Sequence, residues 1–436
     1  MSIALSAGVI LFVTIVILLL LGIPIGISLV VAAILAITQS MGFSAAIPAS
    51  ALKMFQGINI FTLLAIPFFV LAGNIMSKGG IAVRLIHFAT ALTGRIPGSL
   101  AHTNVVANML FGSVSGSGTA AASAMGTIIG PIQKKEGYNE DFSAALNVAT
   151  APTGLLIPPS TALITYALAS GSTSVAALFL GGVIPGILWG LSCMVVVYFY
   201  AKKNGYVAKR SISAKEFFRV TFDALPSLLL IVIVIGGIVS GIFTATEASA
   251  MAVAYSLLLS MFLYKTITIK ELYTILIDSA KLSAIIMFLI GASNILAWVM
   301  SFTEIPTLIA DTILGISDNP IIILLVINLL LLFVGTFMDL TPAILIFTPI
   351  LLPVCQALGM TPLHFGIMLT FNLSIGTITP PVGNILFVGI KVAQRKLENV
   401  MPHLFRFYAA IFVILMLITY VSWFSTFLPK LAGYSY

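Results

Sequence analysis

Charged residues are scarce in this sequence. Only 8% of the 436 residues are Asp, Glu, Lys or Arg, whereas soluble domains carry about 25%. Hydrophobic residues make up 60% of the chain, and the mean hydropathy is +1.17. This composition excludes a soluble globular protein and indicates a multi-pass membrane protein surrounded by a lipid bilayer. The first charged residue is Lys53. The positive region of a signal peptide is therefore missing, and we expect the apolar start to remain as a membrane segment.

Cysteine and histidine are also rare. Cys193 and Cys355 both lie in apolar runs, and the chain has four His. Their spacing fits neither a metal site nor a disulfide framework. The predicted spans contain no Ser-His pair, no His-Glu-x-x-His and no paired aspartates. We therefore expect no enzymatic activity, no cofactor and no transition metal.

The net charge of +7 could indicate a nucleic-acid partner, but the Lys and Arg residues lie in loops between apolar runs. The excess of cations on the cytoplasmic side of membrane proteins explains this pattern better. The one clearly hydrophilic stretch is 201–222, which we expect to be a basic cytoplasmic loop. No nucleic-acid partner is expected.

The chain contains an internal repeat. A shift of 222 positions, without a gap over about fifty residues, aligns matching residues in the two halves: Phe111 with Phe333, Thr119 with Thr341, Pro131 with Pro353, Gly137 with Gly359, Gly154 with Gly376, and Pro158-Pro159 with Pro380-Pro381. Each copy has a break of small or polar residues and, about forty residues later, a second break of the form G-x-x-x-P-P. Duplicated, interrupted hydrophobic segments in a membrane protein point to a secondary transporter.

The repeat predicts an all-α fold of two similar halves. The first half contains scaffold helices in 1–76, a lateral arm at 79–94, a hairpin at 97–133, a broken helix at 140–169 and a span at 174–200. The second contains scaffold helices in 223–302, an arm at 305–316, a hairpin at 319–357, a broken helix at 362–394 and a last span at 402–428.

The distribution of Lys and Arg predicts how these halves are oriented. If 201–222 is cytoplasmic and each hairpin turns back without crossing, 17 of the 20 cations face the cytoplasm. Lys281 then lies near the inner end of its span, and Lys53 and Lys430 face outward. A hairpin that crossed fully would turn the later cations outward. The bias therefore favours two re-entrant hairpins, an inverted repeat and two periplasmic termini.

The breaks carry the polar groups. Na⁺ is a hard cation that suits neutral oxygen ligands. The helix that follows each hairpin tip points its positive N-terminal end at the tip and so favours an anion there. We predict two Na⁺ sites. Their candidate ligands are Ser113, Ser115, Ser117, Gly118, Thr153 and Gly154 in the first half, and Gly335, Thr336, Asp339, Thr377 and Thr379 in the second. The candidate substrate-binding residues between them are Ser117, Thr119, Pro158, Ser160, Thr161, Pro380, Gly383 and Asn384.

Two other interpretations of these residues stay open. Small residues at the breaks can simply allow helices to pack closely. Asp339 can cap the helix that begins near Pro342 instead of binding an ion. Elsewhere, Asn74 and Asn294 are expected to bond between helices, and Glu247 can be an ordinary acid at a helix start.

Motifs over most of the chain resemble the large membrane subunit (the M subunit) of the tripartite ATP-independent periplasmic (TRAP) transporters. They are G-I-P-I-G, A-I-P-F-F-V-L-A-G-N-I-M, G-S-V-S-G-S-G-T-A, L-L-I-P-P-S, G-I-F-T-A-T-E-A, G-T-F-M-D and T-P-P-V-G. One departure is Ala245, where the family commonly has proline, and this puts the start of that helix in doubt.

The resemblance implies a Na⁺-driven importer of the bacterial inner membrane that works by an elevator motion of the hairpins and broken helices. It implies two partners: a small four-helix membrane subunit (the Q subunit), for which 1–76 and 174–200 offer docking surfaces, and a periplasmic substrate-binding protein (the P subunit). The substrate would be an organic acid such as sialic acid or a C4-dicarboxylate. The family's ion-binding oxygens correspond to those of Ser113, Ser117, Gly154, Asp339 and Thr379.

The alternatives are a related Na⁺/carboxylate symporter that works without a binding protein, and an ion channel with re-entrant loops. A channel would need two different loops to form one pore. The inverted duplication and the paired broken spans disfavour it, because they set up alternating access.

Overall fold

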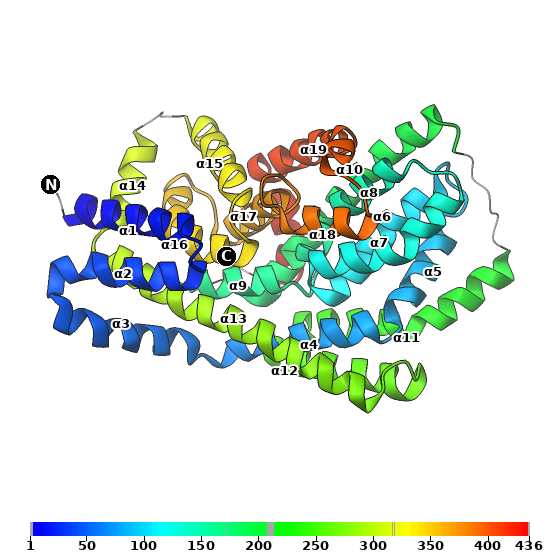
Figure 1. The fold of residues 1–436 in the computed structure, drawn as a ribbon, viewed down its shortest axis with the longest axis horizontal. Coiled ribbons are helices and arrows are strands. Elements are labelled where there is room, and N and C mark those ends of the chain that lie inside the picture. Colours follow the sequence, from blue (N-terminus) through cyan, green and yellow to red (C-terminus); the bar gives the residue numbers. More distant parts are fainter. Residues whose placement is uncertain (1–2, 172, 207–212, 316, 318, 435–436) are drawn as a thin grey trace.

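The computed structural model describes residues 3–171, 173–206, 213–315, 317 and 319–434. Within these residues every regular element is a helix. Figure 1 shows an elongated molecule with α1, α2 and α3 at one end, and with α5, α6 and α8 toward the other. Lys209 and Arg210 of the predicted basic loop lie outside the described residues.

The elements of the first half are α1 (Ile3–Leu20), α2 (Ile25–Met41), α3 (Phe43–Ile58), η1 (Phe61–Leu64), α4 (Ala65–Lys78), α5 (Ile81–Thr93), α6 (Ser99–Ser115), α7 (Gly118–Lys135), α8 (Glu140–Thr150), η2 (Ala151–Leu155), α9 (Thr161–Ser170) and α10 (Val175–Lys203). Those of the second half are α11 (Ala214–Val239), α12 (Ala245–Leu257), η3 (Leu258–Leu263), α13 (Ile269–Phe302), α14 (Ile305–Leu314), α15 (Pro320–Gly335), α16 (Leu340–Ala357), α17 (Pro362–Gly376), α18 (Asn384–Ala393), α19 (Leu397–Tyr420) and α20 (Trp423–Leu431).

Seven helices within the described residues are long and apolar enough to cross a membrane: Phe61–Lys78, Val175–Lys203, Lys215–Val239, Ala245–Leu263, Ile269–Phe302, Leu340–Ala357 and Leu397–Tyr420. Their lengths match the roughly 30 Å hydrocarbon core. The chain is a multi-pass membrane protein.

Several predicted boundaries are corrected by the structure. Helix α3 was not predicted as a separate element of 1–76, because Pro48, Lys53 and Gln56 interrupt its apolar pattern. Within the predicted scaffold segment 223–302, helix α13 begins at Ile269, because Thr268 and Glu271 form a capping box that starts it among charged residues.

The basic loop and the last span also differ from their predicted bounds. Helix α10 ends at Lys203 and α11 begins at Ala214 after its cap Ser213, so the loop is shorter than 201–222. The predicted span 402–428 is two helices, because the chain becomes extended at Val421 between α19 and α20.

Helix α12 begins at Ala245 even though proline is missing there. The Thr244 side chain accepts a hydrogen bond from the Glu247 backbone N–H, and the Glu247 carboxylate accepts one from the Thr244 backbone N–H. This capping box supplies the start signal. Glu247 therefore acts as an ordinary helix-start acid, which is the interpretation given above.

Each predicted hairpin position holds a pair of helices with a short turn, and each predicted broken helix holds two helical pieces. Helices α6 and α7 are joined through Gly116 and Ser117, and Gly116 has φ of 62°, which glycine tolerates without strain. The broken pairs are α8–α9 and α17–α18, and their breaks contain cis peptide bonds at Pro158-Pro159 and Pro380-Pro381.

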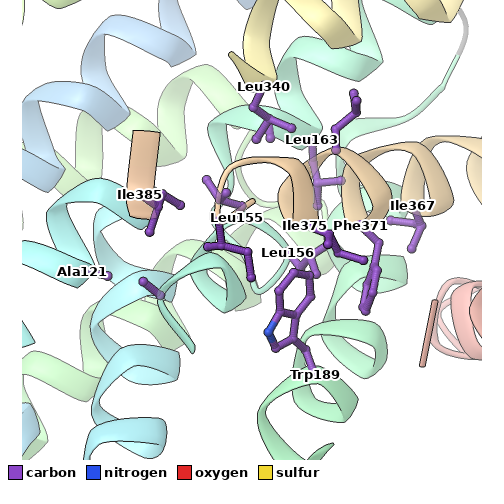
Figure 2. Packing of buried hydrophobic residues seen from close by; sticks show 14 of the residues in the cluster. Ala121, Leu155, Leu156, Leu163, Trp189, Leu340, Ile367, Phe371, Ile375 and Ile385 are labelled. Atoms are coloured by element: carbon purple, nitrogen blue, oxygen red, sulfur yellow. The ribbon is translucent and has the colours of Figure 1, made fainter. Parts of the chain in front are cut away.

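The two halves exchange contacts at these breaks. Helix α9 packs against α16 of the second hairpin, and α18 packs against α7 of the first. Figure 2 shows Leu163 of α9 below Leu340 of α16, with Ile385 of α18 near Leu155. All four side chains belong to one buried apolar cluster. Burial of that cluster therefore brings both hairpin tips to the same place.

Candidate functional site

The tip of the first hairpin is held by hydroxyl groups. The Ser117 side chain caps α7 by accepting a hydrogen bond from the Ala120 N–H at 3.3 Å, and it bonds to the Thr119 hydroxyl at 3.1 Å. The same tip lies close to α4, because a Cβ added to Gly73 would come within 2.6 Å of the Ser115 carbonyl oxygen. Only glycine at position 73 allows this approach.

The tip of the second hairpin is held by a carboxylate. Asp339 caps α16, and its Oδ1 accepts a hydrogen bond from the Leu340 N–H at 2.9 Å. The same oxygen accepts a hydrogen bond from the Asn384 amide at 2.6 Å. Asp339 thus caps α16 through Oδ1, and Oδ2 takes no part in these two bonds.

Each tip is tied to the second piece of a broken helix. The Thr161 hydroxyl at the start of α9 donates to the Gly116 carbonyl at 3.2 Å. Asn384 at the start of α18 makes the corresponding bond to Asp339, and the Val382 N–H donates to the Thr336 carbonyl at 3.1 Å. The two tips therefore have matching attachments with different chemistry.

Both tips and both breaks border one cavity of about 180 Å³. Eight of the predicted site residues line it: Ser115, Ser117, Gly118, Thr119, Thr161, Asp339, Thr377 and Asn384. The side facing the scaffold is formed by Val70, Gly73, Asn74, Leu282 and Ile286 of α4 and α13.

Four helices begin at this cavity. The first residues of α7, α9, α16 and α18 are Gly118, Thr161, Leu340 and Asn384, and each lines it. A helix N-terminus carries a partial positive charge and free N–H groups, which favour an anion. No Lys or Arg is among the described residues that line the cavity, and Asp339 is its one acid. The helix ends are therefore the main positive groups at this cavity among the described residues.

The other ten predicted residues lie outside this cavity. Five of them donate their hydroxyl hydrogen to a backbone carbonyl within the same segment: Ser113 to Leu110, Thr153 to Thr150, Ser160 to Leu155, Thr336 to Phe333 and Thr379 to Ile375. Thr336 and Thr379 also border a second, mostly apolar cavity of about 450 Å³ beside Tyr408.

The remaining five shape the backbone. Gly154 packs directly on the Gly112 backbone, and Gly376 packs directly on the Gly335 backbone, so a Cβ at any of these positions would collide or press hard on its neighbour. These crossings fit the close-packing interpretation of the small residues. Pro158, Pro380 and Gly383 lie in the breaks themselves.

Asn74 is a cavity residue that the sequence reasoning did not place there. Its amide donates to the Ser279 hydroxyl of α13 at 2.8 Å, as expected for a bond between helices, and the residue also lines the cavity. The repeated A-G-N-I and A-S-N-I segments around Asn74 and Asn294 were the available signal.

Comparison with known proteins decides the family. The family model described as "Tripartite ATP-independent periplasmic transporter, DctM component" matches residues 12–424. The chain belongs to this family of TRAP transporter large membrane subunits.

Curated relatives match nearly the whole chain. The chain is 52% identical to the uncharacterized protein YgiK of Salmonella typhimurium, over 97% of each chain. It is 40% identical to the sialic acid TRAP transporter large permease protein SiaM of Vibrio cholerae, over 94% of this chain and 95% of that one. It is 38% identical to the C4-dicarboxylate TRAP transporter large permease protein DctM of the same species, over 98% of each.

The TRAP chain also resembles a solved transporter in fold. The YdaH transporter of Alcanivorax borkumensis matches with a TM-score of 0.64 at 12% identity, over 89% of this chain and 91% of that one. At this identity the likeness shows the fold alone.

Proposed function

We propose that this TRAP subunit moves an organic-acid anion across the bacterial inner membrane, coupled to Na⁺. The observation that carries the proposal is the cavity where four helices begin, bordered by Asp339 and by no described Lys or Arg. Helix N-termini favour the carboxylate of a substrate, while the carboxylate of Asp339 and nearby hydroxyl and carbonyl oxygens suit Na⁺. An ion and an anion bound side by side would neutralise each other in this low-dielectric setting.

Two Na⁺ sites, one at each hairpin tip, follow from the duplicated breaks. The first tip offers only hydroxyl and backbone oxygens, and the second offers the carboxylate of Asp339. Asp339 adds a full negative charge, so the second site should bind Na⁺ more strongly. The two sites are therefore unequal in this proposal.

The proposed motion is an elevator movement of the hairpins and broken helices against the scaffold. Helix α7 packs against α18, α9 packs against α16, and α17 joins α9 and α16, whereas the scaffold touches the site mainly through α4 and α13. A group with dense internal contacts and a limited boundary can move as one body. The inverted arrangement of the two halves, with 201–222 in the cytoplasm and both termini in the periplasm, belongs to this proposal.

The proposed partners are the small four-helix membrane subunit and a periplasmic binding protein that delivers the substrate. Many large apolar side chains of α1, α2 and α3 are exposed, among them Phe12, Leu20 and Phe43. Exposed apolar surface of this kind suits lipid or the small subunit. Sialic acid and C4-dicarboxylates are the first substrates to test, because they are named for the relatives SiaM and DctM.

The test is uptake by proteoliposomes that contain the chain and its small subunit, with the binding protein outside. Radiolabelled sialic acid, a C4-dicarboxylate and a neutral sugar are compared at fixed Na⁺. We expect saturable uptake of one acid and none of the neutral sugar. Equal uptake of all three compounds would contradict recognition of a carboxylate.

A further inference from the structure

A further cavity, which is polar, lies at the base of the first hairpin. It is separate from the cavity between the two hairpin tips (the substrate cavity). It has a volume of about 450 Å³ and lies between α6, α7, α8 and the end of α18. Its interior holds neutral polar side chains, including Asn104, Gln133, Ser143 and Asn147. Lys134 and Arg395, at its rim, belong to the side that the cation distribution assigns to the cytoplasm.

The cavity contains oxygens that lack a hydrogen-bond partner although they are buried. Gln133 is 1% exposed, and its Nε2 donates to the Leu100 carbonyl, which leaves Oε1 without a partner. Ser143 is 7% exposed, and its Oγ also has no partner. An unpaired buried polar atom destabilises the fold unless something binds it. Both residues line the cavity, so a guest in the cavity can satisfy them.

A polar seam continues from this cavity toward the first hairpin tip. On α8 the residues Ser143, Asn147 and Thr150 follow at helical spacing over about 10 Å. The Asn108 amide of α6 donates to Asn147 at 3.1 Å and to Thr150 at 2.8 Å. Its Oδ1 is buried and unpartnered.

The inner end of the seam reaches the tip region. Thr153 bonds to the Thr150 carbonyl, and the next residue, Gly154, packs on Gly112 beside Ser113. The seam thus joins the cavity to the proposed first ion site without passing through the substrate cavity.

The second half of the chain provides an internal comparison. At the 222-residue shift, Thr150 corresponds to Asn372, but Ser143 corresponds to Phe365 and Asn147 to Leu369. Phe365 and Leu369 are fully buried in the apolar core. If the polar seam only held two helices together, its inner end would be enough, as it is in the second half, where the Asn372 amide donates to Asn328. The polar outer end is specific to the first half.

The rim of the cavity does not repel a cation. Lys134 pairs with Glu140 at 3.1 Å, and Arg395 binds Asp141 through two contacts of 2.7 and 3.0 Å. Arg395 also lies 3.8 Å from Glu140. The two cations are therefore matched by two acids. The free groups inside are oxygens that can accept a hydrogen bond or bind a cation, which disfavours an anion as the guest.

We propose that this cavity and the α6–α8 seam form a passage through which Na⁺ moves between the cytoplasm and the first hairpin tip, separate from the substrate route. The proposal rests on the Na⁺ coupling proposed above. A passage affects the rates of ion binding and release equally, so blocking it leaves the equilibrium affinity unchanged.

The blocking variant is Gly130→Phe. Gly130 lines the cavity in α7, and a Cβ added there meets nothing within 4 Å, so a larger side chain can start at this position without displacing a neighbour. Gly236→Phe is the matched control, because Gly236 is also a glycine inside a helix with open space around it, far along the chain in α11. A second variant combines Ser143→Phe with Asn147→Leu and thereby installs the residues of the second half.

The experiment measures ²²Na⁺ binding and its release after dilution, using the complex with the small subunit in lipid nanodiscs. We expect Gly130→Phe and the double variant to slow release about tenfold, with the dissociation constant unchanged, while Gly236→Phe behaves as wild type. Wild-type release rates in Gly130→Phe, with Na⁺ binding intact, would overturn the passage and identify a cavity filled only by water. Absence of saturable Na⁺ binding in the wild type would instead contradict the Na⁺ coupling itself.

Discussion

Asn384 donates a 2.6 Å hydrogen bond to Oδ1 of Asp339 and so joins the start of α18 to the tip of the second hairpin. The two residues are 45 positions apart, and each lies at the N-terminus of its own helix. One oxygen of the carboxylate is thus used for structure. The other is available to a ligand in the cavity that both residues line.

Replacing Asp339 by Asn should weaken the Na⁺ dependence of uptake. The amide keeps an oxygen for the cap but removes the charge, and a hydrogen bond or contact to a charged group contributes about 1.5–3 kcal/mol. The Na⁺ concentration for half-maximal uptake should therefore rise about tenfold. Asp278→Asn removes an acid that pairs with Lys78 outside the cavity, and serves as the control. An unchanged Na⁺ response in Asp339→Asn at normal protein level would refute the ion-binding role.

Replacing Ser117 by Ala should reduce uptake by more than its effect on stability explains. Ser117 caps α7, and loss of a cap costs about 1 kcal/mol of stability. Ser174→Ala removes the same kind of cap from α10, away from the cavity. If Ser117 also binds ion or substrate, only Ser117→Ala loses uptake at equal thermal stability. Equal uptake by the two variants would show that Ser117 acts only as a helix cap.

Gly73→Ala should disfavour the state in which the first hairpin tip rests on α4. The added Cβ would come within 2.6 Å of the Ser115 carbonyl oxygen, which is backbone and cannot rotate away. Overpacking of this kind costs about 1–3 kcal/mol, so we expect uptake to fall about tenfold while substrate and Na⁺ still bind. Gly8→Ala is the control, because its nearest neighbour is 3.9 Å away. Wild-type uptake by Gly73→Ala would show that the tip need not dock there.

The orientation of the halves can be tested with single cysteines at Lys202 and Ser317. Both native cysteines are buried, so background labelling should be low. In the inverted arrangement, a membrane-impermeant maleimide added to intact cells should label position 317 and spare position 202, which should react only after the membrane is opened. Labelling of both positions from the same side would rule that arrangement out.

The sequence predicted the location of the site better than the contacts within it. A polar break in an apolar chain must be buried in protein or line a cavity, so the repeat alone placed Ser117, Asp339 and Asn384 near one another. It could not tell which hydroxyl groups point into the cavity. Ser113 donates to the Leu110 carbonyl and Thr379 to the Ile375 carbonyl, and that choice depends on side-chain rotamers.

The scaffold was less predictable. Helix α3 was missed because Pro48 and Lys53 interrupt its apolar pattern, and the sequence does not show that the helix packs against α13. Asn74 was assigned to an interhelical bond, which is confirmed, but its place at the cavity depends on how α4 meets the first hairpin tip. Contacts between distant segments of this kind carry no local sequence signal.

The central claim is that a Na⁺ gradient drives the organic acid through this protein. The most direct measurement is the internal concentration of the transported acid in proteoliposomes, with Na⁺ high outside, with Na⁺ equal on both sides, or without Na⁺. The account predicts accumulation above the external concentration only with the inward Na⁺ gradient. Equilibration to the external concentration under all three conditions would contradict it and would indicate a channel.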